Sequence, residues 1–241
     1  IELTSVNKKL NGYIAKGLVG VEVINALVVD GRFIPKESWL WDYKDSAGSE
    51  APQIAKTVLQ IVSFYNSCGG YLVYGVKETE KDKVFEAVET DLSAIQPAQL
   101  RDKIENYTDQ YIDFTFKEVE IKLESKVYTL GLIHVPKRQS ANPLAFVKNG
   151  PEKKPGKPPI FLRDQVYFRF LDECKQASTS DNWQMLFSPR EFHPSYGLGD
   201  SVSTSSVTSL ANNLPDRSMI CSEFVGREDL LASLWEWLAD D

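Results

Sequence analysis

The chain has 241 residues, of which 42% are hydrophobic and 25% are charged, and its formal net charge is −7. This balance is typical of a globular protein and excludes a disordered or fibrous chain. No apolar run approaches the roughly 20 residues that cross a bilayer, and residues 1–4 do not begin a secretion signal, so we expect no membrane insertion.

The cysteines and histidines restrict the chemistry. Cys68, Cys174 and Cys221 are scattered and odd in number, which gives neither a disulfide framework nor a CxxC pair. His134 and His193 have no cysteine at ligand spacing, so a zinc site is hard to build from them. A reducing cytoplasm fits best, and any metal would have to be held by carboxylates.

The acidic residues are unevenly distributed. Residues 196–241 contain eight of the 34 acidic residues but two of the 27 basic ones, which leaves the first 195 residues with a net charge of −1. A nearly neutral domain can carry a local basic groove, but it does not bind phosphates by bulk charge alone.

The first part of the chain predicts strands around one helix. Residues 18–34 are rich in Val and Ile around an Asp30-Gly31 turn, and we assign residues 1–34 to an N-terminal strand or hairpin extension. Residues 38–44 are aromatic and predict a strand. Apolar residues recur every three or four positions over 52–67, which predicts an amphipathic helix, and the apolar run 71–76 predicts a buried central strand.

The second part continues the same architecture. Residues 96–109 predict another helix, and residues 114–121 and 126–135 predict paired strands joined by a turn. A polar segment rich in Lys and Pro, 148–159, precedes a further strand over 160–170. The fold class is therefore α+β, with a mixed, largely antiparallel sheet and flanking helices.

Composition also divides the chain. We predict an effector domain at 35–194, a Ser-rich linker at 195–218, and the opening of a downstream module at 219–241, where apolar residues return at helical spacing.

The first cluster with possible chemistry is Glu37-Ser38-Trp39-Leu40-Trp41-Asp42-Tyr43-Lys44. Two carboxylates could hold a divalent cation, and Lys44 could contact a phosphate. Residues five apart on a regular strand point to opposite faces, so Glu37 must lie in a bend before the strand if it is to meet Asp42. The alternative is that both carboxylates are solvated surface acids.

The second cluster runs from Asn66 to Glu78 and contains the pair Gly69-Gly70. It predicts a helix that ends at the glycines, a buried strand, and Glu78 just beyond the end of that strand. The alternative is a tight turn with Glu78 in a solvated loop.

A third feature is basic. Long side chains on a Pro/Gly loop can follow a phosphate backbone, whereas the alternative is a solvated mobile loop. The candidate nucleic-acid-binding residues are Lys148, Lys153, Lys154, Lys157, Arg163 and Arg169.

The two clusters together resemble the Schlafen/AlbA_2-type domain family. The features that carry this resemblance are the order of the carboxylates, the Asn-x-x-Gly-Gly element, the Gly-Val-x-acid strand end and Tyr167-Phe168-Arg169. The resemblance implies a Schlafen-core-like fold. It also implies that Glu37, Asp42 and Glu78 bind Mg²⁺ or Mn²⁺, with Lys44 at the phosphate, and that the domain cleaves RNA such as tRNA. This sequence departs from the family at two positions. Asp42 stands where the family usually has Glu, and Glu78 stands where it often has Asp.

The segment Phe224-Val225-Gly226-Arg227-Glu228 and the leucines after it resemble the opening of a STAND-type, AAA-like NTPase module. This pairing implies a bacterial anti-phage defence protein. We therefore predict a metal-dependent endonuclease, acting on RNA rather than DNA, that is activated when the downstream NTPase region forms a homo-oligomer.

Two other classes of protein stay open. In the first, the domain binds nucleic acid or acts as a scaffold without catalysis, the acids are structural and the basic loop does the binding. In the second, the domain only oligomerises. Metal-dependent turnover separates the nuclease from the first alternative, and failure to bind any RNA or DNA points to the second.

Overall fold

The computed structural model describes residues 3–79 and 84–187. The predicted linker at 195–218 and the predicted NTPase opening at 219–241 lie outside these residues. The described helices are α1 (Leu3–Ala15), α2 (Val21–Leu27), α3 (Ala51–Asn66), α4 (Pro97–Thr108) and α5 (Ser180–Phe187). The strands are β1 (Val28–Val29), β2 (Arg32–Phe33), β3 (Trp41–Lys44), β4 (Gly70–Tyr74), β5 (Val76–Glu78), β6 (Phe85–Ala87), β7 (Thr115–Leu123), β8 (Lys126–Val135), β9 (Tyr167–Phe170) and β10 (Glu173–Gln176).

The main sheet has four strands in the order β3-β4-β8-β7. β3 runs parallel to β4, whereas β8 is antiparallel to both β4 and β7. Three smaller antiparallel pairs, β1-β2, β5-β6 and β9-β10, complete the strands of the described chain. The predicted α+β class and largely antiparallel sheet are confirmed.

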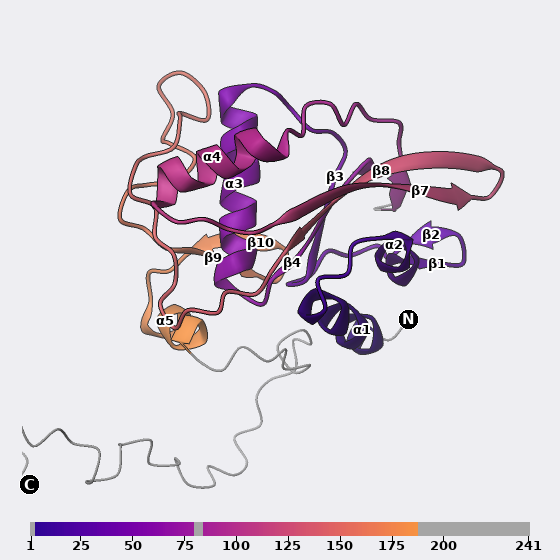
Figure 1. The fold of residues 1–241 in the computed structure, drawn as a ribbon, viewed down its shortest axis with the longest axis horizontal. Helices are drawn as coiled ribbons and strands as arrows, with labels where there is room; N and C mark the ends of the chain where they lie inside the picture. The colour runs from indigo at the N-terminus through magenta and orange to yellow at the C-terminus, as the bar shows by residue number, and fades with distance from the viewer. Residues whose placement is uncertain (1–2, 80–83, 188–241) are drawn as a thin grey trace, which may run out of the picture. The chain divides into compact units, whose positions relative to one another are not determined.

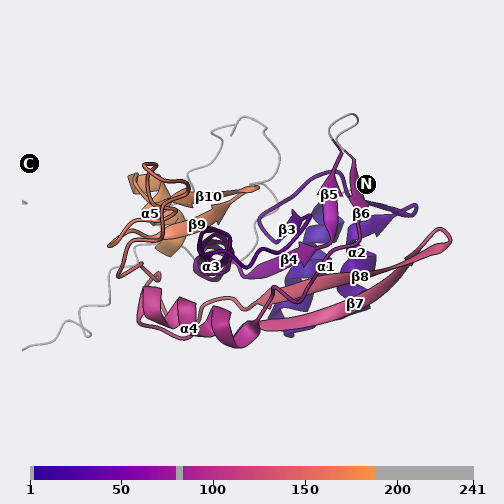
Figure 2. The same ribbon diagram turned by 90° about the horizontal axis from the view of Figure 1, so that it is seen from above.

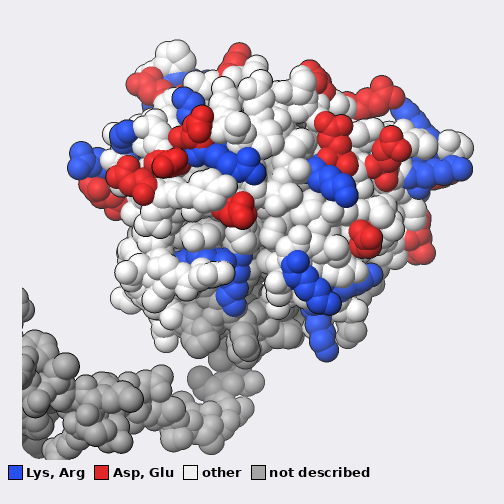
Figure 3. Space-filling model, viewed as in Figure 1, with Lys and Arg blue, Asp and Glu red and all other residues white. Residues whose placement is uncertain are grey.

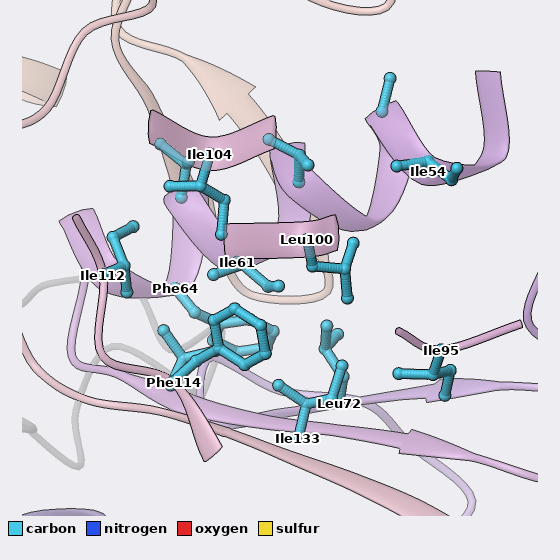
Figure 4. Close-up of a cluster of buried hydrophobic side chains, with 14 of the residues drawn as sticks. Ile54, Ile61, Phe64, Leu72, Ile95, Leu100, Ile104, Ile112, Phe114 and Ile133 are labelled. Atoms are coloured by element: carbon cyan, nitrogen blue, oxygen red, sulfur yellow. The ribbon is translucent and has the colours of Figure 1, made fainter. Parts of the chain in front are cut away.

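Each face of the main sheet is covered by helices. Leu72 and Tyr74 of β4 pack into one core with α3 and α4, whereas Tyr71 and Val73 pack into a second core with α1 and α2. The two pairs of helices accordingly lie on opposite sides of the sheet (Figures 1 and 2). Figure 4 shows the first core, in which Phe64 and neighbouring side chains of both helices meet the sheet. Because both faces of β4 are buried, its sequence is apolar at every position.

The predicted helices and the long hairpin agree with the structure, but the N-terminal extension does not. α1 and α2 occupy most of residues 3–27, and the predicted strand pair is limited to β1 and β2 around Asp30 and Gly31. Both turn residues have positive φ, as a two-residue hairpin turn requires. Val23, Ile24 and Leu27 are fully buried at helical spacing, so packing against the sheet overrides the strand propensity of the Val and Ile side chains.

The predicted strand over 160–170 is also shorter than expected. Only Tyr167–Phe170 forms a strand, and it pairs with β10 rather than joining the main sheet. No described helix is long and apolar enough to cross a membrane.

The Asn66-Ser67-Cys68-Gly69-Gly70 element joins α3 to β4 and to the last hairpin. The buried Asn66 amide nitrogen donates to the carbonyls of Leu144 and Tyr167, both at 2.8 Å, and its oxygen accepts the Leu144 N–H at 2.7 Å. Gly69 has φ +74°, and a Cβ there would lie 2.8 Å from backbone atoms of Val135 and Lys137. This element therefore has a structural role. It forms the turn after α3, and Gly69 lets that turn approach the backbone at the end of β8 closely.

Replacing Asn66 with alanine is expected to lower the free energy of unfolding by about 3 kcal/mol, because buried backbone groups of Leu144 and Tyr167 lose their partners. Urea denaturation of the wild-type and Asn66→Ala chains measures this loss. As a control, exposed Asn106→Ala on α4 is expected to change stability by less than about 1 kcal/mol. Equal stability of the Asn66 variant and the wild type would contradict the structural role.

Candidate functional site

A turn before β3 brings the first two predicted carboxylates together. The Ser38 N–H donates to the Trp41 carbonyl at 3.1 Å, so the chain bends between Glu37 and the strand. Glu37 Oε1 accepts the backbone N–H of Tyr43 at 2.8 Å. The guanidinium of Arg169, from β9, lies 3.0 Å from Asp42 and 3.8 Å from Glu37. The bend that Glu37 needs in order to approach Asp42 is therefore present.

Asp42 is buried at the centre of this carboxylate cluster, which we define as Glu37, Asp42, Lys44, Gln60 and Arg169. Its Oδ1 accepts from Arg169, and its Oδ2 contacts Lys44 Nζ at 2.5 Å and Gln60 Nε2 at 3.0 Å. Asp42 is 1% exposed, so it is not the solvated surface acid of the alternative interpretation. Its charge is stabilised by two cations and one amide, as a buried carboxylate requires.

Glu37 has a different environment. Burial, and then the negative charge of Asp42, raise the pKa of the Glu37 carboxyl from its ordinary value of 4.5 to about 7. Its side chain is 20% exposed, and that of Lys44 is 29% exposed. The Glu37 carboxyl and the Lys44 ammonium are therefore partly accessible to solvent, whereas Asp42 and Arg169 are buried.

The raised pKa of Glu37 predicts a dependence of stability on pH. Between pH 4.5 and about 7 the folded chain holds a proton that the unfolded chain releases, so the free energy of unfolding falls as pH rises through this window. The full loss attributable to Glu37 is on the order of 3 kcal/mol. Urea denaturation at several pH values, with EDTA present, measures it.

The matched control is Glu37→Gln, which mimics the protonated carboxyl and is expected to remove this part of the slope. His134 is buried with its pKa lowered and contributes equally to both proteins. An identical pH slope in the wild type and the variant would show that another group takes up the proton.

The third predicted carboxylate does not join the cluster. Asp42 is paired with Leu72 on β4, whereas Glu78 lies six residues further along, at the exposed end of β5 beside Phe85. Gly75, with φ +89°, separates β4 from β5, and β5 pairs with β6 outside the main sheet. In the described residues no group of three or more His, Cys, Asp or Glu side chains could hold a metal ion. The predicted three-carboxylate metal centre therefore does not fit this arrangement, because the described residues do not group Glu78 with Glu37 and Asp42, and both oxygens of Asp42 already have partners.

The structure contradicts the predicted role of Arg169 as a nucleic-acid contact. Arg169 is 1% exposed, and its guanidinium bonds to Asp42 and to the carbonyls of Ser38 and Leu171. Its role is to hold the turn before β3 against β9. Gln60 was missed because a glutamine within an amphipathic helix gives no signal that it faces a buried acid.

The Lys/Pro segment is a hairpin-like loop whose lysines at 153, 154 and 157 are exposed to solvent. The Lys157 N–H donates to the Lys154 carbonyl at 2.9 Å, and Gly156 has φ +74°. Pro at the second position and Gly at the third are typical of a type II turn. Glu152 accepts the Gly156 N–H at 2.8 Å, which fixes the turn from within.

The base of this loop is anchored to the first core. Gly150 and Phe161 are joined by a backbone hydrogen bond, as are Pro151 and Ile160. The Phe161 ring stacks on that of Phe146 with centroids 3.8 Å apart. The lysines at the tip are therefore presented from a packed base.

The loop and α3 together form a groove of about 580 Å³, which we call the lysine groove. The loop lies beside the first half of α3 (Figure 1). The residues that line the groove are Lys56, Leu59, Lys153, Lys154, Lys157, Pro158, Pro159 and Ile160. Three of the predicted nucleic-acid-binding lysines are brought together here. Lys56 was missed, although its position on the exposed face of the predicted helix was a usable signal.

The other predicted basic residues lie apart from the groove lining. Lys148 Nζ bonds to the Asn106 side chain at 2.6 Å, and exposed Arg163 contacts Asp164 at 3.2 Å. On the face drawn in Figure 3, acidic and basic side chains are interspersed. The lysine groove is therefore a local basic feature of a domain whose first 195 residues are nearly neutral.

The lysine groove and the carboxylate cluster are connected through α3. Lys56 lines the groove, and Gln60, four residues later, bonds to Asp42. Residues four apart lie on the same helix face, about 6 Å along the axis. The two features are thus one helical turn apart on α3.

The fold and these features define an α+β domain with a buried carboxylate–arginine pair and a local basic groove. The chain belongs to the Schlafen, AlbA_2 family, whose model matches residues 36–178. This membership gives the domain a nucleic-acid-related role.

Two of the solved structures that are similar to this chain come from Corynebacterium diphtheriae and Nitrosomonas europaea. The DIP2311 protein from Corynebacterium diphtheriae is 20% identical, with a TM-score of 0.45, and the match covers 76% of this chain and 34% of that one. The N-terminal domain of a RecG-related protein from Nitrosomonas europaea, described as a putative ATP-dependent DNA helicase, is 20% identical with a TM-score of 0.34, and the match covers 63% and 91% of the two chains. The chain thus spans about a third of the DIP2311 protein. No curated protein matches it.

Proposed function

We propose that this domain binds nucleic acid, RNA in preference to DNA, by placing phosphates among the lysines of the lysine groove. One observation carries the proposal: Lys56 and the three loop lysines line one groove, and none of its lining residues is acidic. Glu152, the nearest acid in the sequence, is occupied with the backbone of Gly156. A groove of this kind attracts a polyanion although the domain is nearly neutral.

Fluorescence anisotropy with labelled RNA and DNA of the same sequence tests this function. Binding is expected to weaken steeply between about 50 and 200 mM salt, because each phosphate contact releases counterions. RNA is expected to bind more tightly than DNA. Failure to bind either polymer at low salt would contradict the proposal and favour a purely oligomerising domain.

A second candidate function is phosphodiester cleavage, and the carboxylate cluster favours it. Cleavage needs a proton acceptor and positive charge near the phosphate. The partly exposed Glu37 and Lys44 provide both, in a cluster whose Gln60 lies one helical turn from Lys56 of the groove. In this proposal the domain is an endoribonuclease, with tRNA among its substrates, Asp42 and Arg169 position the other two groups, and Glu78 has no assigned step. The requirement for Mg²⁺ or Mn²⁺ stays a prediction from the family resemblance.

The cleavage assay incubates the 241-residue chain with tRNA, single-stranded RNA and duplex DNA, with Mg²⁺, Mn²⁺ or EDTA. Cleavage of RNA by the wild type and its loss in Glu37→Gln are expected, with Glu78→Gln as the matched carboxylate outside the cluster. EDTA decides the metal requirement. Binding without cleavage under all conditions would leave the non-catalytic binding module as the function.

The wider setting is also a proposal. The pairing with a STAND-type NTPase opening suggests a defence protein whose nuclease is activated by oligomerisation. Light scattering and cleavage rates, measured on the same preparations over a range of concentrations, test it. Activity that rises with the oligomeric fraction is expected, whereas equal specific activity of monomer and oligomer would argue against it.

A further inference from the structure

The lining of the lysine groove consists of lysines and of an apolar part, which we call the apolar floor. Four lining residues are lysines, whereas the other four, Leu59, Pro158, Pro159 and Ile160, are apolar. Phosphate contacts alone need no apolar surface, since lysines on a solvated loop can reach a phosphate backbone. The ligand that matches both surfaces has an apolar face as well as negative charge.

The apolar floor is held in place by the core. Leu59 and Ile160 are partly buried and pack against the first core. Ile160 is fixed by its hydrogen bond to Pro151, and the backbone of Pro158 accepts from Lys153 at 3.4 Å. Leu59 and Ile160 are thus preformed, which lowers the entropy lost when a flat group binds against them.

Size and charge restrict the ligand further. A volume of about 580 Å³ lies within the range of pockets that hold small ligands. The four lysines select an anion, and the floor accepts a planar or apolar group beside it. A nucleotide has this combination, a flat base and a negatively charged phosphate.

We propose that the lysine groove accepts an unpaired nucleotide of a single strand, with its base against the apolar floor and its flanking phosphates among the four lysines. In a duplex the bases are stacked inside, so the floor has no partner there and only the lysines are used. This inference rests on the proposed nucleic-acid-binding function and specifies its substrate as single-stranded or locally unpaired nucleic acid.

The test compares three ligands of equal length with the 241-residue chain: a single strand, its duplex, and the same single strand carrying abasic sites. The single strand is expected to bind about tenfold more tightly than the abasic strand, because one base contact is lost while every phosphate is kept. It is also expected to bind more tightly than the duplex, although the duplex carries more charge.

Two floor variants, Leu59→Asn and Ile160→Thr, are expected to bind the intact and abasic strands almost equally. Both keep the four lysines, and thermal melting by circular dichroism establishes that each is folded. If one variant does not fold, Pro158→Ser, at an exposed position, provides the same comparison.

The outcomes separate this inference from the function on which it rests. Equal affinity of the wild type for intact, abasic and duplex ligands, with binding still lost on removal of the lysines, would overturn the inference and leave phosphate binding intact. No binding of any of the three ligands would instead remove the proposed function.

Discussion

Replacing Lys153, Lys154 and Lys157 with alanine is expected to weaken RNA binding on the order of 100-fold near 0.1 M salt. The turn at Pro155-Gly156 and the carboxylate of Glu152 hold these lysines on one edge of the lysine groove. Each contact to a single strand contributes about 0.7 to the slope of log K against log salt, so the slope is expected to become shallower by about 2. Anisotropy titrations at several salt concentrations measure both quantities.

The matched control changes net charge by the same amount at other surface positions. Lys8, Lys117 and Lys122 are exposed and lie on α1 and β7, outside the groove lining. Their triple alanine variant is expected to bind RNA within about threefold of the wild type, because exposed charges more than a Debye length of about 8 to 10 Å from the ligand are largely screened. Equal losses in the two triple variants would show that RNA responds to total charge and not to the groove.

Breaking the buried ion pair is expected to be costly. Arg169→Met removes the guanidinium that lies 3.0 Å from the 1%-exposed Asp42, and a buried charge that loses its partner destabilises a protein by about 3 to 5 kcal/mol. Lys44 and Gln60 still contact Asp42, which places the expected loss near the lower end of that range, about 3 kcal/mol. Urea denaturation of the variant measures the loss.

The double variant Asp42→Asn/Arg169→Met separates a lost pair from lost packing. Since the asparagine carries no charge, the double variant is expected to recover about 2 kcal/mol relative to Arg169→Met. Additive losses in the double-mutant cycle would show that the two side chains do not interact. The result also affects the interpretation of activity, because a cleavage defect in Asp42→Ala counts as catalytic only if that variant is folded.

Much of the fold could be predicted from the sequence, because period and turn chemistry are local. The apolar spacing of Ile54, Val58 and Ile61 gives α3, and the continuous run of β4 gives a strand buried on both faces. Residues 21–27 were predicted as strand because Val and Ile favour strands. Their helix is set by packing against the sheet, which local sequence does not reveal.

The candidate site was predictable in part. A bend before β3 was the condition for Glu37 to meet Asp42, because regular strand geometry would separate the two side chains, and the structure has that bend. Arg169 and Gln60 are 127 and 18 residues from Asp42, and only the tertiary fold shows that they surround it. Spacing equally could not show that Glu78 is not grouped with the cluster, since its position depends on the turn at Gly75 and on the pairing of β5 with β6.

The lysine groove illustrates the same limit. Lys153, Lys154 and Lys157 are adjacent in sequence and were predicted as one basic feature. Lys56 lies almost a hundred residues earlier and joins them only because the loop packs beside α3. A nearly neutral domain therefore has a basic site that total charge does not indicate.

Photocrosslinking of a single-stranded RNA containing 4-thiouridine to the 241-residue chain, followed by mass spectrometry of the crosslinked peptides, tests the central claim most directly. Nucleic-acid binding at the lysine groove predicts crosslinks in peptides that contain residues 56–59 and 153–160, and their loss at high salt. Crosslinks confined to α1 or to the β7–β8 hairpin, with none in those two segments, would contradict it.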